Sequence, residues 1–169
     1  MEGLINLIIG LFNGIINIPF AKEALIFFIS MLPLLELRGG ILAAALLDMG
    51  GLKSFIICVI ANIIVIPIAL FLLEVIFKLL KKINIFNKII TKFENKCLSK
   101  REQLDKYGYL GLVLFVGIPL PGTGAWTGCF LASLLGMDKK KSFIAATIGV
   151  FMAAIIMQFL SFGILKNLF

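Results

Sequence analysis

Two charged residues, Glu36 and Arg38, lie inside an otherwise apolar stretch of this 169-residue chain. A charged side chain within a bilayer is costly, so ionisable residues in such stretches are functional candidates by default. In a functional interpretation, Glu36 carries a proton and Arg38 holds an anionic headgroup or carboxylate. In a structural interpretation, the two side chains form a local ion pair that satisfies itself and the broken backbone around it. Both interpretations stay open on the sequence.

A second set of candidate residues carries no charge and offers backbone amides, two hydroxyls and an indole. Its members are Pro119, Pro121, Gly122, Thr123, Gly124, Trp126 and Thr127. Amides at a helix start could hold an anion, and the indole could stack on a cation or an apolar ligand. Alternatively, the two threonines cap helix ends and the tryptophan only packs. Asn62, in a long apolar run, could line the same site or make an interhelical hydrogen bond.

Enzyme chemistry and bound metals are not expected. The chain has no histidine, and Cys58, Cys97 and Cys129 are far apart, without the spacing of a metal site. We expect these cysteines to be small apolar packing residues. Phosphate-binding glycine loops, nucleophile elbows and paired catalytic carboxylates are also absent from the sequence. The sequence therefore predicts a protein that is not an enzyme and that needs no cofactor and no metal.

The composition indicates an integral membrane protein. Hydrophobic residues make up 61% of the chain, against about 45–50% in soluble domains. The net charge is +7, and eight of the 16 basic residues lie between positions 81 and 106. Such clustering is typical of the cytoplasmic side of a membrane protein, and no soluble basic face exists to bind nucleic acid. We expect a multi-pass protein of the inner (cytoplasmic) cell membrane, with membrane lipid as its surroundings and no nucleic-acid partner.

Six helical segments are expected to position the candidate residues within a single membrane domain, residues 1–169. They are an N-terminal helix (4–20), a first hairpin (24–50), a transmembrane helix (54–80), a cytoplasmic amphipathic linker (81–106), a second hairpin (109–136) and a transmembrane helix (142–165). Each hairpin region is shorter than two spans of about 20 residues plus a turn. Each should therefore be re-entrant, turning near mid-membrane at its Pro- and Gly-rich centre. Residues 4–20 are short for a span and could lie in the interface.

The two halves of the chain form an internal repeat. At an offset of 88 residues, ten of the 24 positions from Pro33 to Ile56 are identical. These matches include the block Lys53-Ser54-Phe55-Ile56, which falls on Lys141-Ser142-Phe143-Ile144. Because the chain crosses the membrane an odd number of times between the copies, the second copy should be inverted. The fold class predicted is an all-α integral membrane protein, an inverted repeat of a re-entrant helical hairpin plus a transmembrane helix, a design that recurs among transporters.

Two stretches, PLLELRGGI (33–41) and IPLPGTGAWTG (118–128), resemble the signature turns of the putative small multi-drug export protein family, which is itself similar to the DedA/VTT membrane proteins. In this resemblance Glu36 occupies the position of the family's hairpin acid, and Arg38 follows it in the ELRGG signature. The resemblance implies paired re-entrant hairpins, an inner-membrane location in bacteria or archaea and, for DedA-type relatives, lipid translocation dependent on the proton-motive force. DedA proteins usually carry an arginine in the second hairpin, and none lies between Gly108 and Met137.

These features together predict a small secondary transporter or exporter, or a lipid-carrier flippase, in which proton coupling would use Glu36. Its site would lie between the two hairpin turns and take a small-molecule or lipid-headgroup substrate. The alternative is a non-transporting membrane scaffold whose polar turns are structural. Because the chain is short, a cavity could need a second subunit to close it, which leaves a homodimer open.

Overall fold

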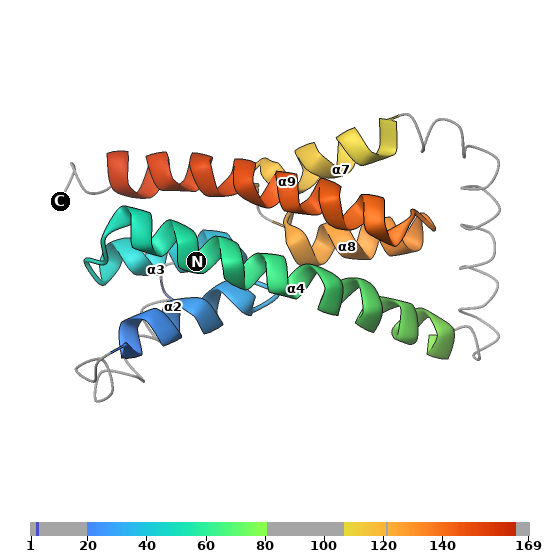
Figure 1. Cartoon of the computed structure of the whole chain (residues 1–169), viewed down its shortest axis with the longest axis horizontal. Helices are drawn as coiled ribbons and strands as arrows, with labels where there is room; N and C mark the ends of the chain where they lie inside the picture. The colour runs from blue at the N-terminus through green and yellow to red at the C-terminus, as the bar shows by residue number, and fades with distance from the viewer. Residues whose placement is uncertain (1–2, 4–19, 81–106, 121, 165–169) are drawn as a thin grey trace. The chain divides into compact units, whose positions relative to one another are not determined.

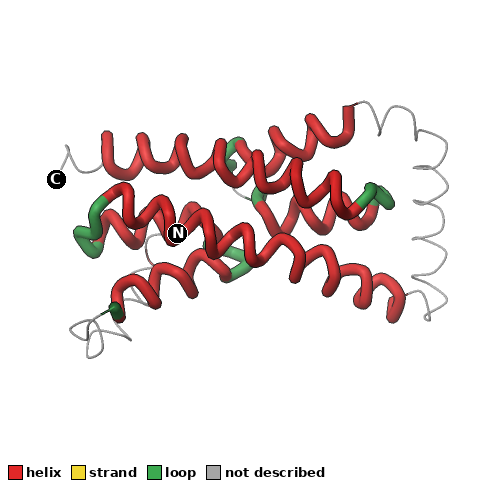
Figure 2. Tube along the Cα trace, viewed as in Figure 1, coloured by secondary structure: helices red, strands yellow, loops and turns green. Residues whose placement is uncertain are grey.

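The computed structural model describes residues 3, 20–80, 107–120 and 122–164, and this part of the chain is helical without any strand (Figures 1 and 2). The helices are α2 (Ala21–Met31), α3 (Glu36–Leu46), α4 (Gly51–Leu80), α7 (Tyr109–Gly117), α8 (Ala125–Leu134), α9 (Lys139–Gln158) and the π-helix η2 (Phe159–Ile164). The prediction of an all-α fold is confirmed for these residues. The predicted N-terminal helix (4–20) and linker (81–106) lie outside the described residues, as do Cys97 and Pro121.

Two helical stretches are long and apolar enough to cross a bilayer: Gly51–Leu72, with 22 residues, and Lys139–Gly163, with 25. At 1.5 Å per residue, either one exceeds a hydrocarbon core of about 30 Å. Together with the apolar composition they indicate a membrane protein. Both helices begin three residues before the predicted starts at Ser54 and Ser142. The sequence analysis placed each start directly after a lysine. In the structure these exposed lysines, Lys53 and Lys141, belong to the first turn of the helix.

The described residues form two compact units. The first unit takes the residues up to Asn62 together with those from Phe151 onward, and the second takes those between Ile63 and Val150. Each unit therefore contains one helical hairpin, part of α4 and part of α9.

In the first unit, α2 and α3 pack against each other as a hairpin. Helix α2 ends because Pro33 disfavours the helical conformation at Leu32, which is extended at φ −68° and ψ 135°. Helix α3 starts only three residues later and includes Gly39 and Gly40, which the sequence analysis had assigned to the break. That assignment was wrong because Gly40 is needed for close packing. A Cβ on Gly40 would overlap the Ser30 hydroxyl of α2 and lie 2.9 Å from Cys58 Sγ of α4.

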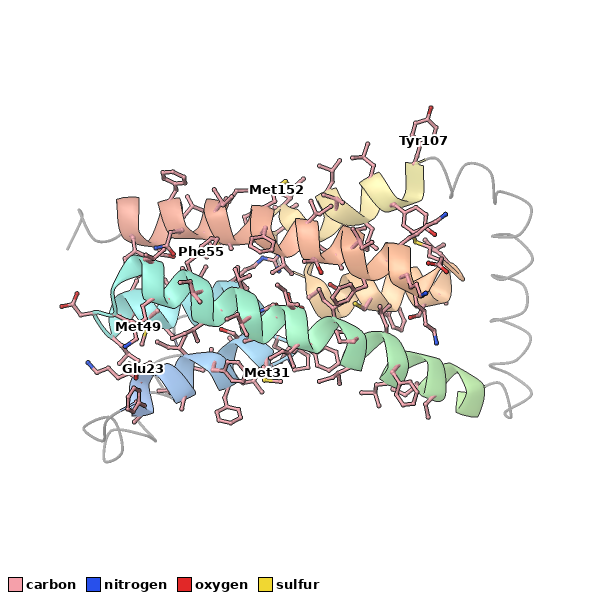
Figure 3. All side chains as sticks on the ribbon, in the orientation of Figure 1. Glu23, Met31, Met49, Phe55, Tyr107 and Met152 are labelled. Atoms are coloured by element: carbon pink, nitrogen blue, oxygen red, sulfur yellow. The ribbon has the colours of Figure 1, made fainter. Side chains whose placement is uncertain are left out.

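The open end of this hairpin is fastened to the start of α4. Figure 3 labels Glu23, in the first turn of α2, and Met49, just after α3. Lys53, near the start of α4, donates a hydrogen bond to Glu23 and lowers the pKa of that carboxyl below its ordinary value. Lys22 donates a hydrogen bond to the Leu47 carbonyl at 3.2 Å. Charged side chains thus close the end of the hairpin that lies farthest from the Pro33 break.

In the second unit, α7 and α8 form a similar hairpin. Gly128 on α8 makes the close contact here, because a Cβ at this position would lie 2.5 Å from Val116 Cγ2 of α7. Val116 is also approached by α9, where a Cβ on Gly149 would lie 2.7 Å from Val116 Cβ. The open end is again fastened to the next helix, since Lys141 Nζ lies 5.6 Å from the centre of the Tyr109 ring.

The two hairpins repeat in their backbone geometry. Adding 88 to the bounds of α2 and α3 gives 109–119 and 124–134, and α7 and α8 span 109–117 and 125–134. Helix α4 starts at Gly51 and α9 at Lys139, again 88 residues apart. The hairpin ends share the same hydrogen bond, from Met49 N to Ala44 O (2.9 Å) and from Met137 N to Ala132 O (3.0 Å). The inverted and re-entrant placement of these hairpins in a membrane stays a prediction.

Candidate functional site

The charged pair Glu36 and Arg38 lies in the first turn of α3, at the break of the first hairpin. Arg38 Nη1 donates to Glu36 Oε2 at 3.3 Å, and their side chains are 9% and 6% exposed, respectively. Burying one charge alone would be costly, whereas a pair at this distance offsets part of the lost hydration. The structure therefore brings together the two residues that the sequence singled out. It places them in a helix and not in the turn itself.

Glu36 has a left-handed backbone conformation, with φ at +51°. For residues other than glycine, this region costs roughly 1–2 kcal/mol because Cβ approaches the backbone. The equivalent position in the second hairpin is Gly124, where φ is also positive at 152°. Its ψ is −168°, so Gly124 has an extended conformation that is open mainly to glycine and that differs from the left-handed conformation of Glu36. Both turns thus need an unusual backbone angle at this position, and only the first carries a carboxylate there. Strain of this kind occurs often at functional sites.

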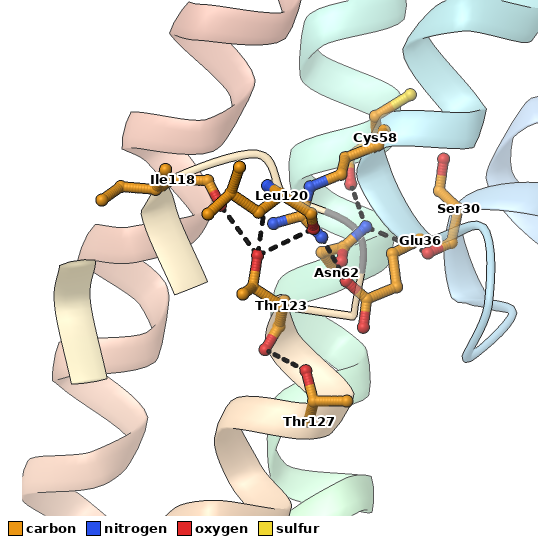
Figure 4. A network of polar contacts seen from close by, with 10 residues as sticks. Ser30, Glu36, Cys58, Asn62, Ile118, Leu120, Thr123 and Thr127 are labelled. Carbon is orange, nitrogen blue, oxygen red and sulfur yellow. Dashed lines mark hydrogen bonds and ion pairs between the residues drawn. The ribbon is translucent and has the colours of Figure 1, made fainter. Parts of the chain in front are cut away.

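Buried polar groups of α2 and α4 lie near the carboxylate. A short connection, residues 47–50, makes α3 and α4 antiparallel, so the contact between Gly40 and Cys58 continues toward Glu36 on α3 and Asn62 on α4. Figure 4 shows Glu36, Asn62, Ser30 and Cys58 in this neighbourhood. Asn62 is 1% exposed, and its Nδ2 donates to the carbonyls of Ser30 (3.0 Å) and Cys58 (3.1 Å). The interhelical hydrogen bond named as the alternative for Asn62 is therefore present.

Ser30 is a residue of this site that the sequence analysis missed. It is fully buried, its Oγ donates to the Ile26 carbonyl at 2.8 Å, and its own carbonyl accepts from Asn62. A usable signal was present, because Ser30 is the only polar residue between Ala24 and Leu32. Because its side chain is small, Ser30 also lets the backbone of α3 approach closely at Gly40.

The turn of the second hairpin is held mainly by Thr123 (Figure 4). Its Oγ1 lies 2.8 Å from Ile118 O and 2.9 Å from Leu120 O, and it accepts from Leu120 N at 3.3 Å. Thr127 Oγ1 donates to Gly124 O at 3.4 Å. Gly124 is the N-cap of α8 and no side chain caps it, whereas Ile118, whose carbonyl Thr123 binds, is the C-cap of α7. The helix-end role suggested for the threonines therefore applies to Thr123 at the end of α7 and not to the start of α8. Thr123 braces the turn by binding carbonyl oxygens, the groups that an interrupted helix leaves exposed.

The remaining candidates of the second hairpin lie along this turn and the start of α8. Pro119 is half-buried, Gly122 is exposed with φ at +82°, and Gly124 is buried. Trp126 belongs to the first turn of α8 and is half-buried. These residues belong to the second unit, whereas Glu36, Arg38 and Asn62 belong to the first. The expected single site between the two turns stays a prediction.

Within the described residues, no three His, Cys, Asp or Glu side chains come together as a metal site. Cys58 and Cys129 are buried free thiols, in keeping with the packing role predicted for them. What the first hairpin offers chemically is one carboxylate and one guanidinium, both buried among apolar helices. Such a pair can exchange partners with a charged ligand or with a proton.

The helical fold, its two candidate spans and the buried ion pair at a helix break define a small helical membrane protein with a charged site in its interior. The chain belongs to the family described as "Putative small multi-drug export protein", whose model matches residues 36–156. The match begins at Glu36 and includes every candidate residue of both hairpins. The resemblance noted from the two turn motifs is thus confirmed, and the relation to DedA/VTT proteins stays a prediction. The chain matches no curated protein and no solved structure.

Proposed function

We propose that this chain is a small exporter, crossing the cytoplasmic membrane several times, in which Arg38 binds an anionic group of the substrate in competition with Glu36. The observation that carries the proposal is the buried ion pair on a strained backbone. The family description supports export in general.

The chemistry of the exchange follows from burial. When an anionic group takes over Arg38, Glu36 is left as a buried carboxylate without its countercharge, and a proton then neutralises it at least cost. When Glu36 loses that proton, the carboxylate reclaims Arg38 and the substrate is released. Binding of substrate would therefore be linked to uptake of a proton. A phosphate headgroup is also an anionic group, so flipping of a lipid carrier is one version of the same mechanism.

The competing function is a membrane scaffold, which is favoured by the 3.3 Å distance between the two charged side chains. A pair that satisfies itself needs no ligand. Replacing both members of such a pair can be nearly neutral for stability, whereas removing one leaves a buried charge and costs about 3–5 kcal/mol. The double variant E36Q/R38M therefore separates the two functions better than either single change.

The experiment measures efflux of carboxyfluorescein, an anionic dye, and ethidium, a cationic dye, from proteoliposomes containing the full chain. We expect the unaltered chain to move carboxyfluorescein and E36Q/R38M to move it at least about tenfold more slowly. Both proteins should have similar thermal unfolding midpoints. A control variant is E23Q, which makes the same Glu→Gln change at a partly exposed ion pair with Lys53 and should keep the full rate.

Two outcomes would contradict the proposal. A folded E36Q/R38M protein that moves carboxyfluorescein at the normal rate would make the pair purely structural. An unaltered chain that moves ethidium but not carboxyfluorescein would exclude Arg38 as the binding group. Repeating the assay with pH gradients of both signs tests the proton link, because a rate independent of the gradient would remove that step.

A further inference from the structure

A groove of about 340 Å³ lies in the second unit, between the later part of α4 and the first turns of α9. Pro67, Leu70 and Phe71 line it from α4, and Lys139, Lys140 and Ile144 are among the residues that line it from α9. The spacings of three and four residues place each set on one face of its helix. Both lysines come from the first turn of α9, and they line this end of the groove with their aliphatic stems. The groove itself is therefore apolar, and the charge of the two lysines lies beside its end.

The apolar residues of the groove are suited to lipid. Phe71 is 67% exposed and Ile144 is 58% exposed, and both belong to the candidate membrane spans. In a bilayer such side chains meet hydrocarbon, so an acyl chain is the natural occupant of the space between them. The volume lies at the lower end of the range for small-ligand pockets, about 300–1,000 Å³.

The two lysines are not demanded by the repeated hairpin. The equivalent positions at the start of α4 are Gly51 and Leu52, which carry no charge. Fastening the hairpin to the long helix is the task of the third lysine of the run, Lys141, which lies over the Tyr109 ring. Lys139 and Lys140 are thus additions to the second copy, and they lie at the mouth of the groove.

Three lysines and one aspartate leave the start of α9 with a net positive charge. Asp138 is the one acidic residue beside the three lysines, and its Oδ1 accepts a hydrogen bond from Lys141 N at 2.9 Å, as a capping residue does. The N-terminal end of a helix carries a partial positive charge, which adds to that of the lysines. An apolar groove with positive charge beside its end matches a phospholipid, in which a charged phosphate is joined to apolar acyl chains.

We propose that this groove is a binding site for one anionic phospholipid, with the phosphate at Lys139 and Lys140 and an acyl chain along Pro67, Leu70 and Ile144. Anionic lipids are enriched at the cytoplasmic face, where basic residues next to membrane helices collect. The site is distinct from the Glu36–Arg38 pair and does not depend on the export function. A lipid held here would tie the start of α9 to the later part of α4.

The test is native mass spectrometry of the full chain released from detergent, titrated with phosphatidylglycerol or phosphatidylcholine. One phosphatidylglycerol should bind more tightly than phosphatidylcholine. Removing one lysine near the lipid should weaken phosphatidylglycerol binding about fivefold, and removing both should weaken it about 30-fold. The affinity for phosphatidylglycerol should therefore fall about 30-fold in K139Q/K140Q and about fivefold in K140Q. I144W, which fills the groove and leaves the charge unchanged, should also bind markedly less.

The matched control is K141Q, which removes a charge from the same lysine run but not from the groove, and it should change binding less than twofold. If K141Q and K140Q lost phosphatidylglycerol binding equally, the lipid would be attracted to the basic start of α9 in general, and the proposed site would be wrong. Unchanged binding in I144W, or saturation of the site by soluble glycerol phosphate, would exclude the acyl chain from the groove and overturn it as well. E36Q/R38M should bind lipid like the unaltered chain, so failure of the export mechanism can be told apart from failure of this site.

Discussion

Glu36 combines burial, charge and an unfavourable backbone conformation in one residue. It is 5% exposed, its φ is +51°, and its countercharge comes from Arg38 two positions later. At the equivalent position the second hairpin has Gly124, which is also at positive φ but in a different conformation, so a hairpin of this kind can be built without a side chain there. A turn that served packing alone would be more stable with glycine at both positions. The carboxylate is therefore easier to explain by what it binds than by what it stabilises.

The closest approach between helices in the first unit depends on Gly40, and Gly40→Ala tests it. The added Cβ would overlap Ser30 Oγ and lie 3.1 Å from Ser30 Cβ. We expect a loss of roughly 1–3 kcal/mol, the usual cost of overpacking, because both neighbours sit in helices that would have to move. This corresponds to a fall of about 2–12 °C in the thermal unfolding midpoint in detergent.

Two further variants make this result specific. Gly111→Ala, in helix α7, has open space where the Cβ would lie, so it should be neutral or stabilising by up to about 1 kcal/mol. The double variant G40A/S30A should recover part of the loss, because it removes the hydroxyl that the new Cβ meets. Equal midpoints for G40A and the unaltered chain would show that α2 and α3 pack less closely than described.

At the scale of the elements, each hairpin ends in the same helix-stop motif. Asp48 has φ at +55° and Gly136 has φ at +63°, and they occupy equivalent positions. Each donates a hydrogen bond of 3.2 Å back to a carbonyl three residues earlier, Ala45 O and Ser133 O, respectively. With the bonds from Met49 and Met137, this is the Schellman arrangement. It turns the chain sharply, so that α4 and α9 can start within five residues of the preceding helix.

Substitution of these stop residues should affect the two hairpins in opposite directions. Gly136→Ala should destabilise the protein by about 1–2 kcal/mol, since alanine is strained at positive φ. Asp48→Gly should be neutral or stabilising by up to about 1 kcal/mol, because aspartate tolerates this conformation better than most residues but less well than glycine. Thermal unfolding of both variants gives the measurement. A stable G136A protein would show that this stop does not govern the hairpin.

At the scale of the whole molecule, the repeat predicts opposite orientations for the two halves. The candidate spans start at Gly51 and Lys139, and each follows one hairpin. Because a single long helix, α4, separates the two starts, they should lie on opposite sides of the membrane. Backbone repetition at a constant offset supports two equivalent halves, and the charge of Lys139 and its neighbours favours the cytoplasm for the second start.

This orientation can be tested by maleimide labelling of single-cysteine variants K53C and K139C, with the native cysteines replaced by alanine. Both positions are exposed. In right-side-out vesicles an impermeant reagent should label K53C and spare K139C, and in inside-out vesicles the pattern should reverse. If both positions were labelled from the same side, the predicted inverted repeat would be wrong. The structural basis for comparing the chain to transporters of that design would then be lost.

Much of the architecture was accessible from the sequence because it depends on local properties. Hydropathy over about 20 residues indicated the spans. Pro33 ended α2 through its effect on the preceding residue. Adding the offset of 88 residues to the first residues of α2, α3 and α4 gives the first residues of α7, α8 and α9 to within one residue. The two turn motifs also pointed to the family that the chain belongs to.

Tertiary structure decided what depends on neighbours far apart in the chain. Gly39 and Gly40 look like helix breakers in sequence, yet they are helical, because Ser30 and Cys58 leave room only for a glycine at position 40. The sequence left open which helix end Thr123 would serve, and the path of the turn decided that it binds the carbonyls of Ile118, at the end of α7, and of Leu120. In the sequence Lys139 and Lys140 are only two members of a basic run, and the fold alone places α4 beside them. Periodicity encodes which residues are apolar or helical, but contacts between helices exist only once the chain has folded.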